Sequence, residues 1–302
     1  MLNALIRLGL KFRFLRVVID RLRIRTIANR WLGRFPIERS LPSSNIRYRM
    51  RSLDSLLVAR EIFAEGAYQG ILPLRNITHF ADVGCNCGFF TCFLMDALGR
   101  KDLFALMLDA NPRMVKEANW HIEANGFANV YAVWGVAGAP VGTSLFYLHP
   151  DDAGSSHFAE LPAGHVTRNQ WRRIEAPSLS LETKWRSQFG DQPCDLLKVD
   201  IEGSEALFVE NEAKFLASVG MVVIEVHHWL VDVAKLERDL DMLSFSLVKV
   251  LSTDDKTDVR FYRHRDRDLV KETIPDVVQF KAGGHISGGS HPFGGSTAIV
   301  TA

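Results

Sequence analysis

The sequence lacks several features that would place it in common functional classes. Its 302 residues contain no apolar run of about eighteen residues, so no membrane-spanning helix is expected. The first residues also lack the uninterrupted apolar stretch and small-residue cleavage site of a secretory signal. Only four cysteines occur, without the spacing of a zinc finger or a disulfide scaffold. We therefore expect reduced thiols, no metal site and a cytoplasmic protein.

Acidic residues are nearly absent from the beginning of the chain. Residues 1–51 hold thirteen Arg and Lys against only Asp20 and Glu38, a charge of about +11. Because the net charge of the whole chain is +1, residues 52–302 carry a charge of about −10. Arginines alternate with aliphatic residues and Trp31, which predicts a basic amphipathic helical extension over residues 1–50. The extension could pack on the domain or contact anionic lipid at the inner face of the membrane. Nucleic acid is not expected as a partner, because aromatic residues that stack on bases are few and the remaining chain is acidic.

The rest of the chain predicts an α/β fold. From His79 onward, apolar strand-like runs alternate with helical patterns, which is typical of a doubly wound, mostly parallel sheet of seven strands. The parallel strands are expected at residues 79–83, 103–110, 130–137, 194–203 and 220–229, with helices at 89–98, 112–125, 181–189, 205–218 and 231–243. Residues 245–251 and 259–264 should form an antiparallel hairpin.

Two domain boundaries follow from these patterns. The predicted domain covers residues 51–265, and the tail at 266–302 becomes rich in Gly and Ser from about residue 283, which indicates disorder. A short extra strand is expected at 145–149 and a polar loop at 150–168. Long loops of this kind often belong to a functional site.

The first strand ends in the most informative segment, ADVGCNCG at residues 81–88. Asp82 lies at the carboxyl end of the strand, and Gly84 and Gly88 would let a ligand approach the backbone before a helix. The segment reads G-x-x-x-G and not the G-x-G-x-x-G of dinucleotide sites, so NAD is not expected. Asp109, at the end of the second strand, could bind a ribose diol. Its alternative role is to cap the next helix through Asn111-Pro112.

Several ordered motifs resemble one enzyme family. DVGCNCGFFT and LDANP resemble motifs of S-adenosylmethionine-dependent methyltransferases. SLSLETKWRSQFG, CDLLKVDIEGSEALFVE and VVIEVHHW resemble segments of the FkbM-type methyltransferases, over about residues 55–262. The chain departs mildly from that pattern at Cys85, Cys87, Asp109 and the Ser180-Leu181-Glu182 segment, changes that keep size or charge.

The resemblance implies S-adenosylmethionine as the cofactor and a Rossmann-like methyltransferase fold. It assigns the cofactor to Asp82, Gly84, Asn86, Gly88, Asp109, Ala110, Asn111, Val136 and Asp200. It places Ser155 and Ser156 near the substrate, and Glu202 is expected there from its position at the end of a strand. The implied reaction is O-methylation of a hydroxyl on a sugar, glycolipid or secondary metabolite. An inactive cofactor-binding scaffold and a nucleotide-dependent oxidoreductase are the alternatives.

A hydroxyl acceptor needs a base, and the strand ends supply candidates. Asp200 is the first of these, and Glu225 and His227 complete the predicted catalytic set. Glu225 stands among apolar residues and should need a partner, either Lys198 on the neighbouring strand or a divalent metal shared with Asp200. His227 shares the strand face of Glu225, whereas His228 points to the opposite face.

Overall fold

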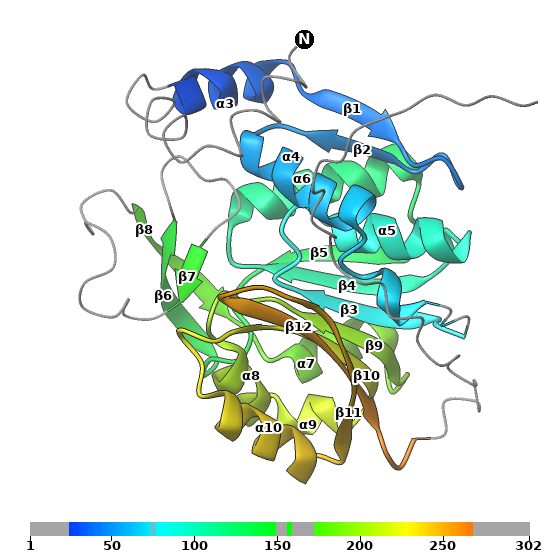
Figure 1. The fold of residues 1–302 in the computed structure, drawn as a ribbon, viewed down its shortest axis with the longest axis vertical. Helices are drawn as coiled ribbons and strands as arrows, with labels where there is room; N and C mark the ends of the chain where they lie inside the picture. The colour runs from blue at the N-terminus through cyan, green and yellow to red at the C-terminus, as the bar shows by residue number, and fades with distance from the viewer. Residues whose placement is uncertain (1–23, 73, 75, 149–155, 159–171, 268–302) are drawn as a thin grey trace, which may run out of the picture. The chain divides into compact units, whose positions relative to one another are not determined.

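A computed structural model gives the fold of the chain, and it describes residues 24–72, 74, 76–148, 156–158 and 172–267. Within them, a seven-stranded sheet has the order β11-β12-β10-β9-β3-β4-β5 (Figure 1). Its parallel strands are β3 (His79–Val83), β4 (Phe104–Asp109), β5 (Val130–Trp134), β9 (Cys194–Val199) and β10 (Val219–His227). β11 (Phe245–Thr253) and β12 (Thr257–His264) form an antiparallel hairpin. The predicted fold class is confirmed.

The strand order reverses once between β3 and β9. The chain runs outward from β3 through β4 to β5, and then returns to β9 on the other side of β3. At such a switch point the connections leave the sheet in opposite directions, which opens a crevice at the carboxyl ends of the two strands. The strands that end in ADVG and KVDIEG are therefore the pair that flanks this crevice.

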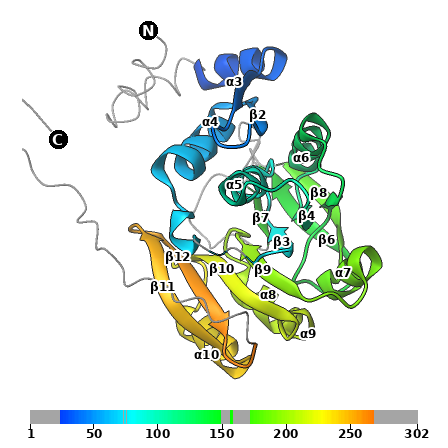
Figure 2. The ribbon, with the colours of Figure 1, turned by 90° about the vertical axis from the view of Figure 1, so that its right-hand side faces the viewer.

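Helices cover both faces of the sheet (Figure 2). α5 (Phe89–Leu98) and α6 (Pro112–Asn125) pack on one face in a core with the strand residues Phe80, Met107 and Leu196. α7 (Leu181–Phe189), α8 (Glu205–Asn211), α9 (Ala213–Leu216) and α10 (Val233–Met242) pack on the other face. Because β9 is buried along its whole length between the two layers, its carboxyl end is held rigidly.

Local sequence signals explain the helix boundaries that were predicted correctly. α6 begins with Pro112 after Asn111, whose side chain accepts a hydrogen bond from the Arg113 amide, and it ends at Gly126 with φ of 65°. The predicted helix 205–218 is instead broken into α8 and α9 at Glu212. The carboxylate of Glu212 is buried there and accepts hydrogen bonds from the amides of Leu181 and Gly138. A tertiary contact thus interrupts a continuous amphipathic pattern.

Residues 24–71 fold onto the α5 and α6 side of the sheet. They form α3 (Ile24–Arg34), a hairpin of β1 (Ile37–Ser40) and β2 (Arg47–Met50), α4 (Leu53–Arg60), a π-helical turn η1 (Glu61–Glu65) and a 3₁₀ turn η2 (Gln69–Ile71). The hairpin was not predicted. Ile46, Met50 and Ile62 of this segment are buried in the same core as α5. The first 23 residues and residues 268–302 of the predicted tail lie outside the described residues.

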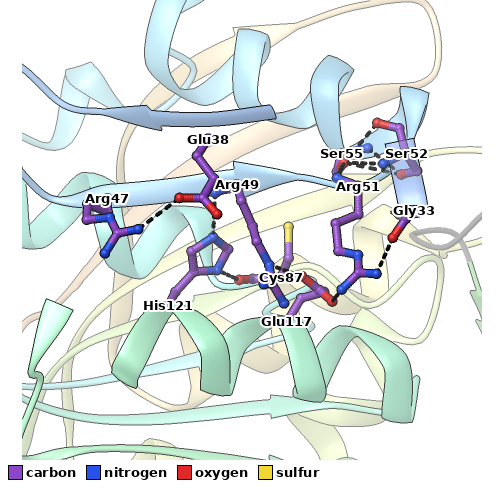
Figure 3. A network of polar contacts seen from close by, with 10 residues as sticks. All are labelled: Gly33, Glu38, Arg47, Arg49, Arg51, Ser52, Ser55, Cys87, Glu117 and His121. Atoms are coloured by element: carbon purple, nitrogen blue, oxygen red, sulfur yellow. Dashed lines mark hydrogen bonds and ion pairs between the residues drawn. The ribbon is translucent and has the colours of Figure 1, made fainter. Parts of the chain in front are cut away.

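A buried histidine joins the hairpin to the glycine-containing loop (Figure 3). The amide of Arg49 donates to Nε2 of His121 at 2.9 Å, so Nδ1 of His121 carries the proton and donates to the carbonyl of Cys87 at 2.7 Å. Burial lowers the pKa of His121 to about 4. The Arg49 guanidinium also binds Glu117 at 2.8 Å and lies 4.1 Å from the Trp120 ring centroid. Arginines of the basic segment therefore hold the fold together as well.

A second, three-stranded sheet lies after β5. It has the order β7-β6-β8, with β6 (Gly142–Leu148), β7 (Ser156–Phe158) and β8 (Arg172–Ser178). The extra strand predicted at 145–149 corresponds to β6, but β8 was missed because its sequence RRIEAPS contains a proline and little apolar alternation. Most of the loop predicted at 150–168 lies outside the described residues. No described helix is both long enough and apolar enough to cross a membrane.

Candidate functional site

The glycine-containing loop between β3 and α5 is shaped by its contacts with neighbouring loops. Gly84 has φ of 71°, and a Cβ atom there would lie 1.7 Å from the carbonyl oxygen of Asp200. The amides of Gly84 and Cys85 both donate to the carbonyl of Leu108. At Gly88, with φ of 82°, a Cβ atom would meet the sulfur of Met107 at 3.1 Å. Gly84 thus makes room for the backbone at Asp200 and Gly88 for the side chain of Met107, in addition to the ligand approach expected from the sequence.

Asp109 closes this loop from the end of β4. One carboxylate oxygen accepts the amide of Asn86 at 2.8 Å, and the other accepts the amide of Asn111 at 2.7 Å. Burial raises the pKa of Asp109 to about 7, against the lowering effect of these two hydrogen bonds. Each oxygen keeps a second lone pair, so the carboxylate can still accept a hydroxyl. Asp109 thus holds this loop together and lines the pocket wall, while the cap of α6, the alternative role considered for Asp109, is made by the side chain of Asn111.

Lys198 links the two acids that the motifs contribute. Its ammonium lies 3.5 Å from Asp82 and 3.2 Å from Asp200, and it donates to the carbonyl of Gly84 at 2.8 Å. Burial would lower the pKa of Lys198, but the charges of Asp200 and Asp82 outweigh it and hold that pKa well above the usual range. Lys198 therefore pairs with these acids and not with Glu225, the partner that we had considered.

Asp82 lies beneath the site. Its side chain is fully buried, and it accepts a hydrogen bond from the hydroxyl of Thr91 at 3.1 Å. Asn111 is likewise 1% exposed and caps α6. Asp82, Asn111 and Gly88 are not among the residues that line the three pockets described next. These three predicted cofactor residues shape the loop from behind.

Three adjoining pockets open at the carboxyl ends of the strands. The first, which we call the strand-end pocket, is lined by the other predicted cofactor residues: Gly84, Asn86, Asp109, Ala110, Val136 and Asp200. The inner pocket, of about 260 Å³, lies between this loop and α4 and η1. The outer pocket lies between η1 and the β11–β12 hairpin. Glu202 lines all three pockets and so marks the place where they meet.

Glu225 faces both the inner and the outer pocket. It is half-buried, and no hydrogen bond or ion pair to its carboxylate occurs among the described residues. Burial, and next the charge of Asp200, raise the pKa of Glu225 to about 8. Glu61 of η1 lines the same two pockets, and burial followed by the charge of Asp200 raises its pKa too. An unpartnered carboxylate at this depth is free to accept a proton or a hydrogen bond from a ligand.

His227 is held by acids on two sides. It is 5% exposed, and its Nδ1 bonds the fully buried carboxylate of Glu205 at 2.8 Å. Its Nε2 lies 3.4 Å from Glu202. Burial lowers the pKa of His227, but Glu202 and Glu205 raise it to about 11. His228 instead pairs with Asp258 at 2.8 Å, so the choice of His227 for the site agrees with the alternation of side chains along β10.

Ser155 and Ser156, which were predicted to lie near the substrate, border a segment that the structure does not describe. Ser155 lies outside the described residues, and Ser156 begins β7, where it pairs with Leu148. Sequence reasoning missed Glu61, Tyr68 and Trp229, which also line the pockets. The first two belong to a segment without a family motif, whereas Trp229 directly follows VVIEVHH and could have been included. All four cysteines are buried and free.

A mostly parallel sheet with a terminal hairpin and pockets at its switch point is the architecture of the Rossmann-like methyltransferases. A family model described as the Methyltransferase FkbM domain matches residues 82–248, more than half of the chain. The chain therefore belongs to the FkbM methyltransferase family, as its motifs predicted.

Several solved structures are similar to the chain at low identity. The fibrillarin pre-rRNA processing protein of Methanococcus jannaschii is 11% identical with a TM-score of 0.44, over 76% of this chain and 82% of that chain. Aeropyrum pernix fibrillarin with natively bound S-adenosyl-L-methionine is 12% identical with a TM-score of 0.40, over 63% and 68%. M. capricolum TrmK in complex with S-adenosyl-homocysteine is 11% identical with a TM-score of 0.39, over 66% and 67%. No curated protein sequence matches the chain.

Proposed function

We propose that this protein is an S-adenosylmethionine-dependent O-methyltransferase that acts on a hydroxyl group of a sugar, a glycolipid or a secondary metabolite. The observation that carries the proposal is the position of Glu225. Its carboxylate has no protein partner among the described residues and faces both the inner and the outer pocket, next to the Asp200 end of β9. A hydroxyl, unlike a thiol or an amine, needs such a base to attack at neutral pH.

The residues of the strand-end pocket fit the cofactor. Asp109 offers its remaining lone pairs to ribose hydroxyls, and Ala110 and Val136 form the apolar wall for a flat base. Asn86 and Asp200 line both this pocket and the inner pocket, so they stand at the end where the reactive group must lie. When bound, S-adenosylmethionine supplies an electrophilic methyl group on a sulfonium.

Glu225 would take the proton of the acceptor hydroxyl, and the bound cofactor would supply the methyl group to that oxygen. Asp200, held through its contact with Lys198, positions the reactants between the two pockets, and His227 fixes the Glu202 side of the outer pocket. Holding both reactants in line supplies a large part of the rate enhancement of such a displacement. In this assignment the role of base moves from Asp200, which we had placed first, to Glu225.

The outer pocket favours a neutral, hydroxyl-rich acceptor. Glu61, Glu225 and Asp254 offer carboxylate oxygens that accept hydrogen bonds from hydroxyls, and the ring of Trp229 is 42% exposed at the wall. Five carboxyl groups line this pocket against the basic side chains of Arg60, Lys256 and His227, and an excess of acidic groups disfavours phosphate groups. The pocket chemistry thus favours a sugar over a nucleic acid as the acceptor.

We further propose that α3 brings the enzyme to a membrane surface that carries such an acceptor. Ile27, Trp31 and the following Phe35 are 65%, 52% and 54% exposed and form one stripe, while Leu32 on the other side is buried. α3 has no acid in its first turn and ends with Arg34. Exposed aromatic and aliphatic side chains beside arginines suit the interface of an anionic bilayer.

Methyl transfer from labelled S-adenosylmethionine to a panel of sugars and glycolipids tests the main proposal. Glu225→Gln should lower turnover on a methylated acceptor at least about a hundredfold, because the base contributes 10² to 10⁴ in rate. The Kd for S-adenosylmethionine should stay unchanged, and the exposed control Glu123→Gln should behave like the wild type. Full turnover by Glu225→Gln would remove Glu225 as the base. Cofactor binding without transfer to any acceptor would favour the scaffold alternative.

A further inference from the structure

We propose that Asp200, Glu202 and His227 form a binding site for a divalent cation at the junction of the three pockets. One ligand atom from each residue lies within 4.8 Å of the other two. Around one octahedral cation with bonds of about 2.1–2.5 Å, neighbouring ligands are about 3–3.5 Å apart and opposite ones about 4.2–5 Å, so the three atoms can converge on one ion with small side-chain movements. The two carboxylates suit Mn²⁺ or Mg²⁺, while the imidazole nitrogen would also suit Zn²⁺.

The surroundings of His227 are those of a metal ligand. Its side chain is buried, its Nδ1 is bound by the carboxylate of Glu205 at 2.8 Å, and its Nε2 points toward the Glu202 carboxylate. Histidines that bind metals usually bond a carboxylate through the other ring nitrogen, which fixes the ring and its tautomer. Glu205 itself is fully buried and also accepts the amide of Gly203 at 3.0 Å. Glu205 is thus a positioning residue for His227.

Charge and location favour the same site. Five carboxylates surround the junction, those of Glu61, Asp200, Glu202, Glu205 and Glu225. Lys198 pairs with Asp200 of this cluster, but its ammonium group is shared with Asp82. Glu202 lines every pocket, Asp200 lines the strand-end and inner pockets, and His227 lines the outer one. A cation bound by all three residues would stand between the cofactor side and the acceptor side.

A protonated His227 held between Glu202 and Glu205 is the competing explanation for this arrangement. The two differ in what they predict for added metal. A cation displaces the proton from Nε2 and takes its place between His227 and Glu202. A permanent imidazolium has no free ring nitrogen and therefore cannot bind the cation.

The cation would have a defined task, and this step rests on the proposed function. A divalent ion that binds the acceptor oxygen lowers the pKa of its hydroxyl, which eases the transfer of the proton to Glu225. The same ion would also fix that oxygen in line with the methyl group.

Titration of the metal-free, full-length protein with Mn²⁺, followed by the electron paramagnetic resonance signal of free Mn²⁺, tests the site directly. We expect one saturable site, with Mg²⁺ as a competitor. Glu202→Gln should weaken binding at least about tenfold, and Glu205→Gln should weaken it about 10- to 100-fold through His227. Glu65→Gln removes a carboxylate from the same outer pocket without touching the ligand set, so it should bind Mn²⁺ like the wild type.

Absence of saturable Mn²⁺ binding, or equal binding by wild type and Glu202→Gln, would overturn the proposal. Glu202 is partly exposed, so its substitution should leave folding intact, which circular dichroism checks. Binding of S-adenosylmethionine is measured on the same samples. Methyl transfer that persists without any Mn²⁺ site would refute the cation site alone, while Mn²⁺ binding without methyl transfer would refute the proposed function alone.

Discussion

The carbonyl oxygen of Asp200 occupies the space that a Cβ atom on Gly84 would need, 1.7 Å from its ideal position. The loop after β3 and the loop after β9 therefore touch through their backbones at the switch point. This contact places Asp200 beside Asn86 and Asp109 in the strand-end pocket. A single side chain at Gly84 would separate the two loops.

Gly84→Ala should be much more harmful than Gly99→Ala. Both glycines have positive φ, 71° and 63°, so alanine strains the backbone at each, but a Cβ atom on Gly99 meets nothing within 4 Å. Gly99→Ala should cost about 1 kcal/mol of unfolding free energy, because alanine is disfavoured in the left-handed conformation. Gly84→Ala should cost about 2 kcal/mol or more beyond that, because a clash with backbone cannot relax. Urea unfolding of the two variants measures the difference, and equal losses would refute the contact.

Asp109→Asn should weaken cofactor binding. The carboxylate accepts one amide on each oxygen, and an asparagine would turn its NH₂ group toward either Asn86 or Asn111. The mismatch should cost about 1–3 kcal/mol of stability, and loss of the charged acceptor for the ribose hydroxyls should lower the affinity for S-adenosylmethionine about tenfold. Isothermal titration calorimetry measures this. Asp102→Asn, exposed and just before the same strand, should bind normally, and an unchanged Kd for Asp109→Asn would exclude Asp109 from the site.

The pH dependence of stability should carry a contribution from His121. Burial lowers its pKa from the ordinary 6.5 to about 4. The folded protein therefore holds His121 neutral, while the unfolded chain takes up a proton below pH 6.5. The stabilising contribution is complete above that pH and is lost as the pH falls toward 4, by about 2 kcal/mol between pH 7.5 and 5.

Urea unfolding of wild type and His121→Gln at these two pH values isolates that contribution. Glutamine can still accept from the Arg49 amide and donate to the Cys87 carbonyl, but it does not titrate. The variant should lose about 2 kcal/mol less than the wild type between pH 7.5 and 5. Parallel losses in both proteins would show that His121 does not titrate as its burial implies.

Serine substitutions at Trp31 and Phe35 should reduce binding to vesicles of anionic lipid. Both rings are about half exposed, so their loss removes apolar surface available to the bilayer without opening the core. We expect at least about a tenfold lower partition coefficient in a sedimentation assay. Serines at Leu247 and Val250 of β11, which are 47% and 46% exposed, provide the matched control. If both double variants bind alike, α3 is not the membrane contact.

Much of the fold was predictable because its signals are local. Apolar runs, an Asn-Pro start and a terminal glycine gave the bounds of β3, α5 and α6, since periodicity and caps act within a few residues. The ordered motifs also predicted the family, which the family model confirms. β8 and the β1–β2 hairpin were not predicted, because both contain charged residues and depend on contacts with distant segments.

The sequence by itself determined the sheet, the family and the acids at the strand ends. Only the tertiary structure decided how those acids are paired. Lys198 binds Asp82 and Asp200 instead of Glu225, and Glu205, the last residue of the KVDIEGSE segment after β9, binds His227. The register of the buried strands and the packing of α8 decide which acid lies beside each basic side chain. A sequence shows which residues are charged, but it does not show which of them lie close enough to pair.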